Sequence, residues 1–453
     1  MITYGYFALL GLSCLLALSN WRQAVYAAIA LDFLRDPVRK LDQGESVLIT
    51  VSVLGLWGVI MISAWGKSQQ EIHEFFRFNP RLLQAFRLLL LAILPGCVIS
   101  LIFYSGGYTL VALGLVSYLA PFAGVLLGVL FAKDPVQMER VLRFYCVVNG
   151  IALTSVIAEY TKVDLPALGG LRDMNWIRYS GFEIVNLIGG FYRSPDIMGL
   201  HAAQVVMFSM ILATRRNQGL SIGWLALALF GSLCLLLSGR RKMLGMPLVF
   251  MAATAFFCYL RGIRYTQFAA MPVIALSAAA AGVYLVGTDD FVADEYTNFA
   301  TTLFTDGVSR SQQIVAGSVA STLSQSGVIG SGIGSATQGA YHVSDGPKTG
   351  WQEDGVSRLF KELGIIGVVL AAFAITSAIR AVILAVRRTP RASSHSLFQL
   401  MLIAVVVANA ASFMVSHQQY SGDPPSAIIV LMVLGMGLSV AIPYQKAWQM
   451  SMR

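Results

Sequence analysis

The chain has 453 residues, of which 56% are hydrophobic and only 12% are charged. An average soluble domain is about one quarter charged, so this composition excludes an ordinary soluble protein and predicts a polytopic membrane protein. The net charge of +9 does not indicate nucleic-acid binding, because the basic residues are scattered over short segments between apolar stretches.

Apolar stretches of spanning length recur along the chain. A helix of about 20 apolar residues crosses a bilayer, and roughly twelve stretches fit this length: 2–19, 47–65, 88–104, 108–131, 141–159, 197–213, 220–237, 243–260, 268–286, 362–384, 398–415 and 426–444. We therefore expect an all-α polytopic membrane protein with a single transmembrane domain over residues 1–453. The stretch 22–34 is too short to cross easily, and we expect an interfacial or re-entrant segment there.

Basic residues predict the orientation of these helices. Cytoplasmic segments of inner-membrane proteins carry an excess of Lys and Arg, so the linker at 387–391 (RRTPR) is expected inside. Counting back from it places 160–196 and 287–361 outside, as two sizeable periplasmic loops. Both termini are then cytoplasmic. The segment 68–84 mixes Phe with Arg and Glu, which is typical of an amphipathic helix on the inner membrane surface.

Counting the helices in this way places two groups of cations on the outer side of the membrane. The triplet at 240–242 (RRK) lies between two apolar stretches. Cations that break the charge bias need a reason, and an anionic ligand at the outer face is the simplest one. Arg35, Arg39 and Lys40 also fall outside. Either the stretch 22–34 dips into the membrane, or the count is wrong by one crossing near the N-terminus.

The first outer loop leads into a helix at Pro195 and Asp196, which are residue types that suit a helix N-terminus. Two interpretations of Arg193 stay open. It forms a surface ion pair beside the helix cap, or its side chain lines a cavity at the membrane face. The five cysteines lie inside predicted spans, and no Cys/His spacing is typical of a zinc site. We therefore expect no metal and no cofactor.

The second outer loop contains a Gly-rich run at 327–334. Such a turn can offer backbone N–H groups to an anion, although a flexible loop is the favoured interpretation. Asp354, Arg358 and Glu362 are spaced four residues apart, so we expect an ion-pair ladder on one helix face. Glu353 lies outside that ladder at an apolar boundary, where loss of water makes a carboxylate a stronger base. It is a candidate to accept a proton from a hydroxyl group, with His342 as its competitor.

Four short elements, in this order, resemble the O-antigen ligase and O-antigen polymerase superfamily over residues 180–384. The run 190–196 (GFYRSPD) is similar to the family's Gly-x-x-x-x-Pro-Asn element, and 238–241 (SGRR) resembles its Ser-Arg turn. Arg310 followed by the Gly-rich run resembles its loop arginine and turn. The run 355–364, which ends in Glu-Leu-Gly, resembles the start of its next helix. The spacing from Arg178 to Gly189 also fits the polymerase branch.

The resemblance implies a glycosyltransferase of the bacterial inner membrane whose donor is an oligosaccharide on undecaprenyl diphosphate. Arg240 or Arg241, together with Arg310 and Arg193, would neutralise the leaving diphosphate. Glu353 would deprotonate the acceptor hydroxyl. The other residues assigned to substrate binding are Arg178, Asp354, Arg358 and His342. The implied partners are the lipid-linked oligosaccharide, the growing glycan acceptor, membrane lipids and, for a polymerase, a chain-length regulator.

Ligases of this family carry His-Asn nine residues before the Glu of Glu-x-Gly, where this chain has Glu353-Asp354. This departure favours a polymerase of a secreted polysaccharide over a ligase that transfers the glycan to lipid A core or another acceptor. Two alternatives stay open besides the ligase. One is a transporter for the same lipid-linked glycan, which predicts charges near mid-membrane, although nearly all charges lie in loops. The other is a non-catalytic assembly subunit.

Overall fold

The computed structural model describes residues 2–42, 44, 47–132, 135–169, 177–180, 183–214, 221–263, 294, 296, 298, 307–337, 340, 352–391 and 394–442. For 177–180, 183–186 and 307–315 it describes the backbone alone. The chain packs as two compact units, each built from two stretches of sequence. The first unit comprises 1–67 and 134–307, and the second comprises 68–133 and 308–453.

Helices occupy every predicted apolar stretch that the structure describes, and only 268–286 lies outside the described residues. Nine helices among the described residues are long and apolar enough to cross a membrane. This confirms an all-α polytopic membrane protein. Exposed side chains agree with it, because Leu12 and Leu15 are 63% and 64% exposed, and the exposed aromatic residues Tyr4 and Tyr259 lie near helix ends.

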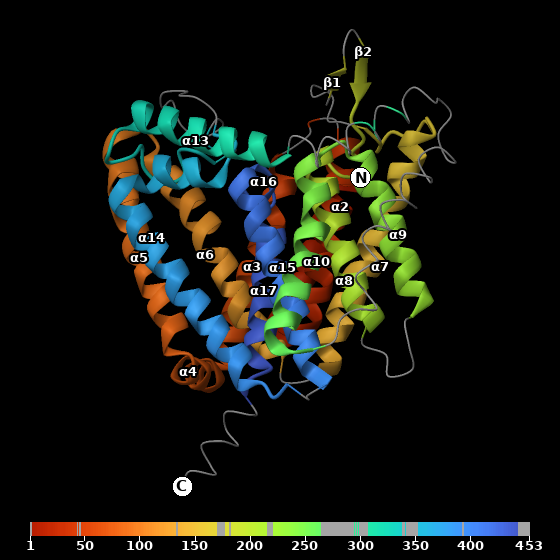
Figure 1. The fold of residues 1–453 in the computed structure, drawn as a ribbon. Helices are drawn as coiled ribbons and strands as arrows, with labels where there is room; N and C mark the ends of the chain where they lie inside the picture. Colours follow the sequence, from red (N-terminus) through yellow and green to blue (C-terminus); the bar gives the residue numbers. More distant parts are fainter. Residues whose placement is uncertain are drawn as a thin grey trace. The chain divides into compact units, whose positions relative to one another are not determined.

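The first unit contains one deeply buried helix, α8. Its helices are α1 (Ile2–Ser19), α2 (Trp21–Leu41), α3 (Val47–Lys67), α7 (Pro135–Tyr160), α8 (Pro195–Thr214), α9 (Ile222–Leu237) and α10 (Arg241–Arg261) (Figure 1). Helices α7, α9 and α10 pack against α8. An antiparallel pair of strands, β1 (Ile177–Ser180) and β2 (Glu183–Asn186), precedes α8.

Helix α2 corrects the interpretation of the stretch 22–34. The helix continues to Leu41, and at 1.5 Å per residue it is roughly 32 Å long, which is enough to cross a bilayer. It packs against α1, α3 and α7 rather than lying apart from them. The apolar run appeared too short because Asp32, Arg35 and Asp36 interrupt it, and these three side chains are buried inside the unit.

The length of α2 also changes the expected position of the N-terminus. Thr3 Oγ1 donates to a carboxylate oxygen of Asp42 at 3.0 Å, so α1 begins where α2 ends. The Lys40 ammonium group donates to the carbonyl oxygens of Gly190 and Tyr192, just before α8. The N-terminus therefore lies at the end of the unit where α8 begins. The prediction that the N-terminus and the segment before α8 lie on opposite sides is therefore wrong, because the count took 22–34 as too short to cross whereas α2 is long enough.

The second unit contains a close pair of helices, α6 and α17, whose glycines allow contact between backbones. Its helices are α4 (Gln69–Phe78), α5 (Pro80–Phe103), α6 (Gly107–Phe131), α13 (Gly307–Ser326), α14 (Gly355–Arg388), α15 (Ser394–Val415), α16 (Gln418–Gly422) and α17 (Pro424–Ser439). Gly128 of α6 lies against the carbonyl of Met432 in α17. The predicted amphipathic helix is α4, and its buried Phe75 packs with Leu82 and Ala385.

The Gly-rich run forms a packed turn within the second unit. Ile333 is fully buried, and its N–H donates to the carbonyl of Gly96 in α5 at 3.0 Å. The N–H of Ser331 donates to the carbonyl of Lys361 in α14 at 2.6 Å. Gly334, at φ +82°, lies so close to α6 that a side chain would collide with the Leu110 carbonyl. Both earlier interpretations are therefore wrong: the run is no flexible loop, and these donors already have protein acceptors.

Gly364 provides a test of this packed turn. It interrupts α14 at φ +66° and ψ −178°, and a Cβ there would collide with the carbonyl oxygen of Ile329. We expect Gly364→Ala to lower the free energy of unfolding by roughly 1–3 kcal/mol, measured by thermal unfolding in detergent. Gly317→Ala, in open space on α13, is the control and leaves the midpoint unchanged or slightly higher. Equal midpoints for the two variants would contradict the packed turn.

Candidate functional site

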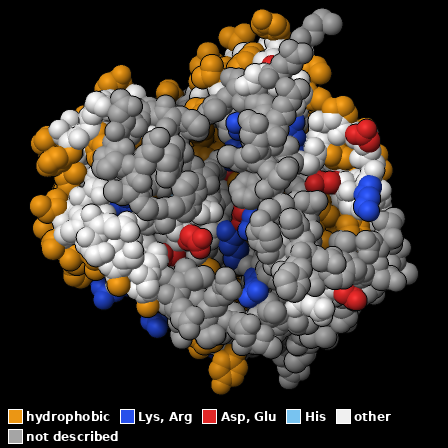
Figure 2. Space-filling model, turned by 90° about the horizontal axis from the view of Figure 1, so that it is seen from above, with side chains coloured by type: hydrophobic (Ala, Val, Ile, Leu, Met, Phe, Trp, Pro, Cys, Tyr) orange, Lys and Arg blue, Asp and Glu red, His pale blue; other side chains and the backbone are white. Residues whose placement is uncertain are grey.

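Charged side chains of the first unit gather where α8 and α10 begin. We call Asp36, Arg193, Asp196, Arg240 and Lys242 the ionic cluster. Figure 2 views the molecule from the end at which α8 begins in Figure 1, and it shows Lys and Arg side chains close to Asp and Glu side chains. All five side chains are buried or half-buried. The charges are thus held within the fold rather than spread over a solvated surface.

Asp196 joins the N-termini of two helices. It lies in the first turn of α8 and is only 6% exposed. Its carboxylate oxygens lie 3.1 Å from an Arg240 guanidinium nitrogen and 2.7 Å from the Lys242 ammonium nitrogen. The partial positive charge at both helix N-termini adds to this attraction. Helix α10 can begin so close to α8 because Gly199 leaves no side chain in the way of Met243.

The SGRR element forms the turn that presents these cations. Gly239 adopts φ +60°, a conformation that glycine takes without strain. The hydroxyl of the buried Ser238 accepts a hydrogen bond from the N–H of Arg240 at 3.2 Å. Arg240 is the residue before α10, and Arg241 is its first residue, with a half-buried side chain. The turn therefore directs the Arg240 side chain to Asp196.

Arg193 is held by Asp36 of α2. Its guanidinium group lies 4.0 Å from the Asp36 carboxylate, and its backbone N–H donates to the same carboxylate at 3.1 Å. Arg35 lies 3.6 Å from Asp36 and 2.7 Å from Asp32. The Arg193 side chain is only 11% exposed. The interpretation of Arg193 as part of a surface ion pair is therefore wrong, because its partner lies on a buried stripe of α2.

Lys40 clamps the segment that precedes α8. Its ammonium group donates to the carbonyl oxygens of Gly169, Gly190 and Tyr192 at 2.5, 2.7 and 2.7 Å. The Glu159 carboxylate at the end of α7 accepts from the N–H of Gly190 at 2.6 Å. Cations at this end of the unit thus have internal partners. These cations lie where the excess of Lys and Arg in cytoplasmic segments does not predict them, because they hold the fold together and do not set the topology.

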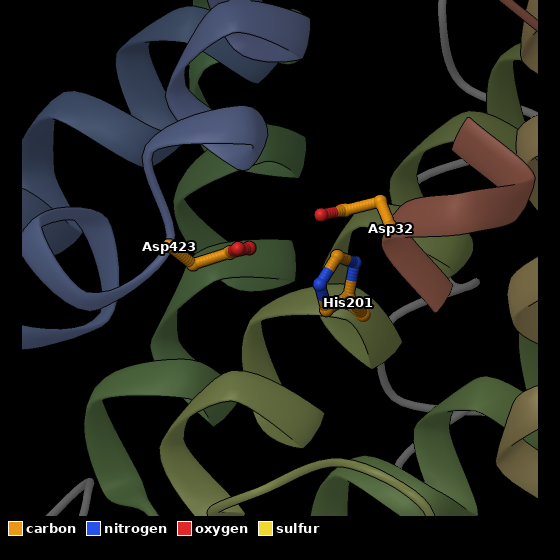
Figure 3. Close-up of side chains that lie close together, drawn as sticks. All are labelled: Asp32, His201 and Asp423. Carbon is orange, nitrogen blue, oxygen red and sulfur yellow. The ribbon is translucent and has the colours of Figure 1, made fainter. Parts of the chain in front are cut away.

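A buried polar network continues along α8 from the ionic cluster. Figure 3 shows Asp32 and His201 side by side in the first unit, while the labelled Asp423 belongs to the second unit, where its carboxylate accepts from Ser426. A carboxylate oxygen of Asp32 and a ring nitrogen of His201 lie within 4.8 Å. The Tyr145 oxygen lies 2.7 Å from His201 Nδ1. Within the described part of the first unit, no three His, Cys, Asp or Glu donors converge as a metal site would require.

The second unit changes the roles of the residues that begin α14. Glu353 is exposed, so the expected desolvation of its carboxylate is wrong. Asp354 is the N-cap of α14 and accepts from the N–H of Ser357 at 2.7 Å. It lies before the helix, so it is not a rung of the predicted ladder. The pair of Arg358 and Glu362 is confirmed, with 3.2 Å between Nε and Oε2.

Arg358 and Glu362 hold the Gly-rich turn to the helices. Glu362 is fully buried and accepts from the Tyr118 hydroxyl at 2.7 Å and from the N–H of Ala336 at 3.1 Å. Arg358 donates to the Ser117 hydroxyl at 2.7 Å. The Glu-Leu-Gly element thus has a structural role in this chain, because its Glu binds the turn and its Gly makes room for it.

The structure brings Arg193, Arg240 and Arg241 to one end of the first unit, where α8 and α10 begin. Glu353, Asp354 and Arg358 lie together at the start of α14 in the second unit. Only the backbone is described for Arg178, in β1, and for Arg310, in α13. The competing base His342 lies outside the described residues.

Sequence reasoning missed Asp32, Asp36 and His201, and it treated Lys40 only as a conflict in the topology count. The signal was present in α2, where Asp32, Arg35, Asp36 and Arg39 recur at the three- and four-residue spacing of one helix face. The claim that nearly all charges lie in loops is therefore wrong for this helix. Nothing in the sequence distinguished His201 from an incidental histidine, because its partners come from α2 and α7.

Comparison with models of known protein families and with curated protein sequences gave no match. The assignment of a function therefore depends on the site and on the chemistry of its residues.

Asp196→Asn tests the ionic cluster. The change removes the charge that Arg240 and Lys242 share while preserving side-chain size. We expect a loss of about 1–3 kcal/mol in the free energy of unfolding, less than for a fully buried pair because both cations are partly exposed. Chemical unfolding in detergent measures it, with the exposed Asp164→Asn as the control. A loss no larger than that of the control would show that the cluster does not stabilise the fold.

Proposed function

We propose that the protein is a metal-independent membrane glycosyltransferase. It polymerises oligosaccharide repeat units, carried on undecaprenyl diphosphate, into a secreted polysaccharide at the outer face of the bacterial inner membrane. The observation that carries the proposal is the convergence of Arg193, Arg240 and Lys242 at the N-termini of two helices in a membrane protein. Cations and helix N-termini together are suited to a diphosphate.

Two helix N-termini and three cationic side chains give the cluster the kinds of group that bind an anionic ligand. Arg193, Arg240 and Lys242 carry three positive charges, against the two carboxylates Asp36 and Asp196. Arg240 and Lys242 share the Asp196 carboxylate, and Arg193 and Arg35 share the Asp36 carboxylate. Negative charge grows on the diphosphate as the glycosidic bond breaks. Each preorganised donor that stabilises this negative charge increases the reaction rate roughly 10²–10³-fold.

The orientation follows from the second unit. Arg388, in the basic linker, donates to the Phe78 carbonyl of α4, and the end of α17 packs with Phe75 of the same helix. Under the positive-inside rule we place this end of the second unit, where α14 and α17 end, on the cytoplasmic side. Helix α3 begins at Val47, shortly after the end of α2, and ends at Lys67, directly before α4. In this proposal the end of the first unit where α8 begins, with the ionic cluster, therefore faces the outer side.

A transporter for the same lipid-linked glycan is the second candidate. It is favoured by Asp32, Arg35 and Asp36, which are buried in the interior of a helix long enough to cross the membrane. Ionisable residues in such positions are typical of transport pathways. A ligase is the third candidate, and it differs from a polymerase only in the acceptor.

Arg240→Gln tests the assigned chemistry. We expect the purified variant to extend a lipid-linked repeat unit roughly 10²–10³ times more slowly than the wild type, because it cannot neutralise the leaving diphosphate. Gel separation of the polymer measures the rate. The matched control is Arg143→Gln, which removes an exposed arginine of α7 and should preserve the rate. An unchanged rate for Arg240→Gln would contradict the role of the cluster.

A deletion strain distinguishes the candidate functions. Loss of a polymerase leaves single repeat units on the lipid carrier at the outer face. Loss of a ligase leaves full-length polymer on the carrier, and loss of a transporter leaves repeat units at the inner face. Mass spectrometry of the lipid-linked glycans distinguishes the three outcomes. Enzymatic digestion of intact spheroplasts determines which face of the membrane carries the glycan. Only the first result agrees with the proposed function.

A further inference from the structure

We propose that one end of the second unit binds the headgroups of anionic phospholipids. This end lies where α5 begins and α14 ends, and its exposed arginines form what we call the arginine patch: Arg77, Arg81, Arg87, Arg380, Arg387 and Arg391. In the part of the chain that the structure describes, none of these guanidinium groups forms an ion pair. The inference goes beyond the proposed function, because no patch residue belongs to the ionic cluster.

Contacts within the second unit bring the arginine patch together. Helices α5 and α14 pack side by side in opposite directions, and the Ser377 hydroxyl of α14 donates to the Arg81 carbonyl near the start of α5 at 2.7 Å. Helix α4 lies at the same end (Figure 1), where Arg388 donates to the Phe78 carbonyl at 3.3 Å. Cations from α4, from the start of α5 and from the last turns of α14 therefore meet at one end of the unit.

Arg87 continues an apolar face of α5. Arg87, Leu91 and Leu94 follow one another at spacings of four and three residues, which places them on one side of the helix. Leu91 and Leu94 are 53% and 56% exposed, and such leucines of a membrane-spanning helix face the lipid chains. Arg87 is seven residues from the start of α5, or roughly 10 Å along the axis. It therefore lies near the boundary between lipid chains and headgroups, and its long side chain can extend to the phosphates.

Helix α14 repeats this arrangement. Phe373, Arg380 and Arg387 are exposed and lie seven residues apart, which is close to two helical turns. Phe373 is 60% exposed, and Ile383, about one turn beyond Arg380, is 45% exposed. Arg380 lies eight residues before the end of the helix at Arg388, or roughly 12 Å along the axis. Both helices thus change from apolar to cationic on their exposed sides before they end.

Position and residue type both favour a lipid phosphate as the partner. Cations in the linkers are sufficient to set a topology, whereas Arg87 and Arg380 lie about two turns inside their helices. All cations of the patch are arginines, whose planar guanidinium group binds two phosphate oxygens at once and is more weakly hydrated than an ammonium group. Glu71 and Glu74 of α4 are the acidic side chains among the described residues of this end, so positive charge dominates it. A headgroup with net negative charge therefore fits the patch better than a zwitterionic one.

Lipid titration of the purified full-length protein in detergent tests the inference. We expect native mass spectrometry to show tighter binding of phosphatidylglycerol than of phosphatidylcholine with the same acyl chains. The double variant Arg87→Gln with Arg380→Gln should bind phosphatidylglycerol about 10–30 times more weakly, because each arginine near the headgroups contributes roughly fivefold. The matched control is Arg140→Gln with Arg143→Gln, which removes two exposed arginines of α7, one of them already paired with Glu139. It should bind both lipids like the wild type.

Weaker binding in the patch variant alone supports the inference. An equal loss in both double variants overturns it, because that result would show an effect of net charge alone. A wild type without preference for phosphatidylglycerol, or one whose lipid binding is suppressed by an equal concentration of soluble glycerol phosphate, overturns it as well. Thermal unfolding without added lipid should give equal midpoints, since all four side chains are exposed. If the patch variant has a lower midpoint, the single Arg87→Gln is titrated instead, and a loss of less than about twofold overturns the inference.

Discussion

The carboxylate of Asp196 determines how the first unit brings charge together. Two helix N-termini, each with partial positive charge, and two cationic side chains would repel one another without it. Asp196 lies between them in the first turn of α8, and Gly199 allows α10 to begin in contact with the same helix. The cluster therefore exists because one buried negative charge offsets several positive ones.

The same constraint explains helix α2. A charged side chain in an apolar environment is costly unless it is paired. Asp32 pairs with Arg35, Asp36 binds Arg193, and Lys40 satisfies three carbonyl oxygens. These contacts fix the segment before α8 and, with it, the position of Arg193. What first looked like a conflict in charge sidedness is a set of internal ion pairs and hydrogen bonds that hold α2 against its neighbours.

The short sequence motifs that resemble the family serve different purposes in the two units. In the second unit, the Gly-rich run and Glu362 are used in packing, where Tyr118, Ala336 and Arg358 satisfy the carboxylate. In the first unit, the SGRR turn presents cations at a helix start. Motifs that look equally functional in a sequence thus separate into a structural group and a chemical group once their hydrogen-bond partners are known.

The sequence by itself determined that the chain is an all-α membrane protein and where its long helices lie, because hydrophobicity and helix length are local properties. It also picked out Arg193, Arg240 and the pair of Arg358 and Glu362, since caps and four-residue spacings are local too. Tertiary structure alone decided that α2 continues to Leu41 with charged side chains buried, that Asp354 is a cap and Glu353 is exposed, and that His201 lies beside Asp32. These features depend on which distant residues satisfy a buried charge, and no local pattern contains that information.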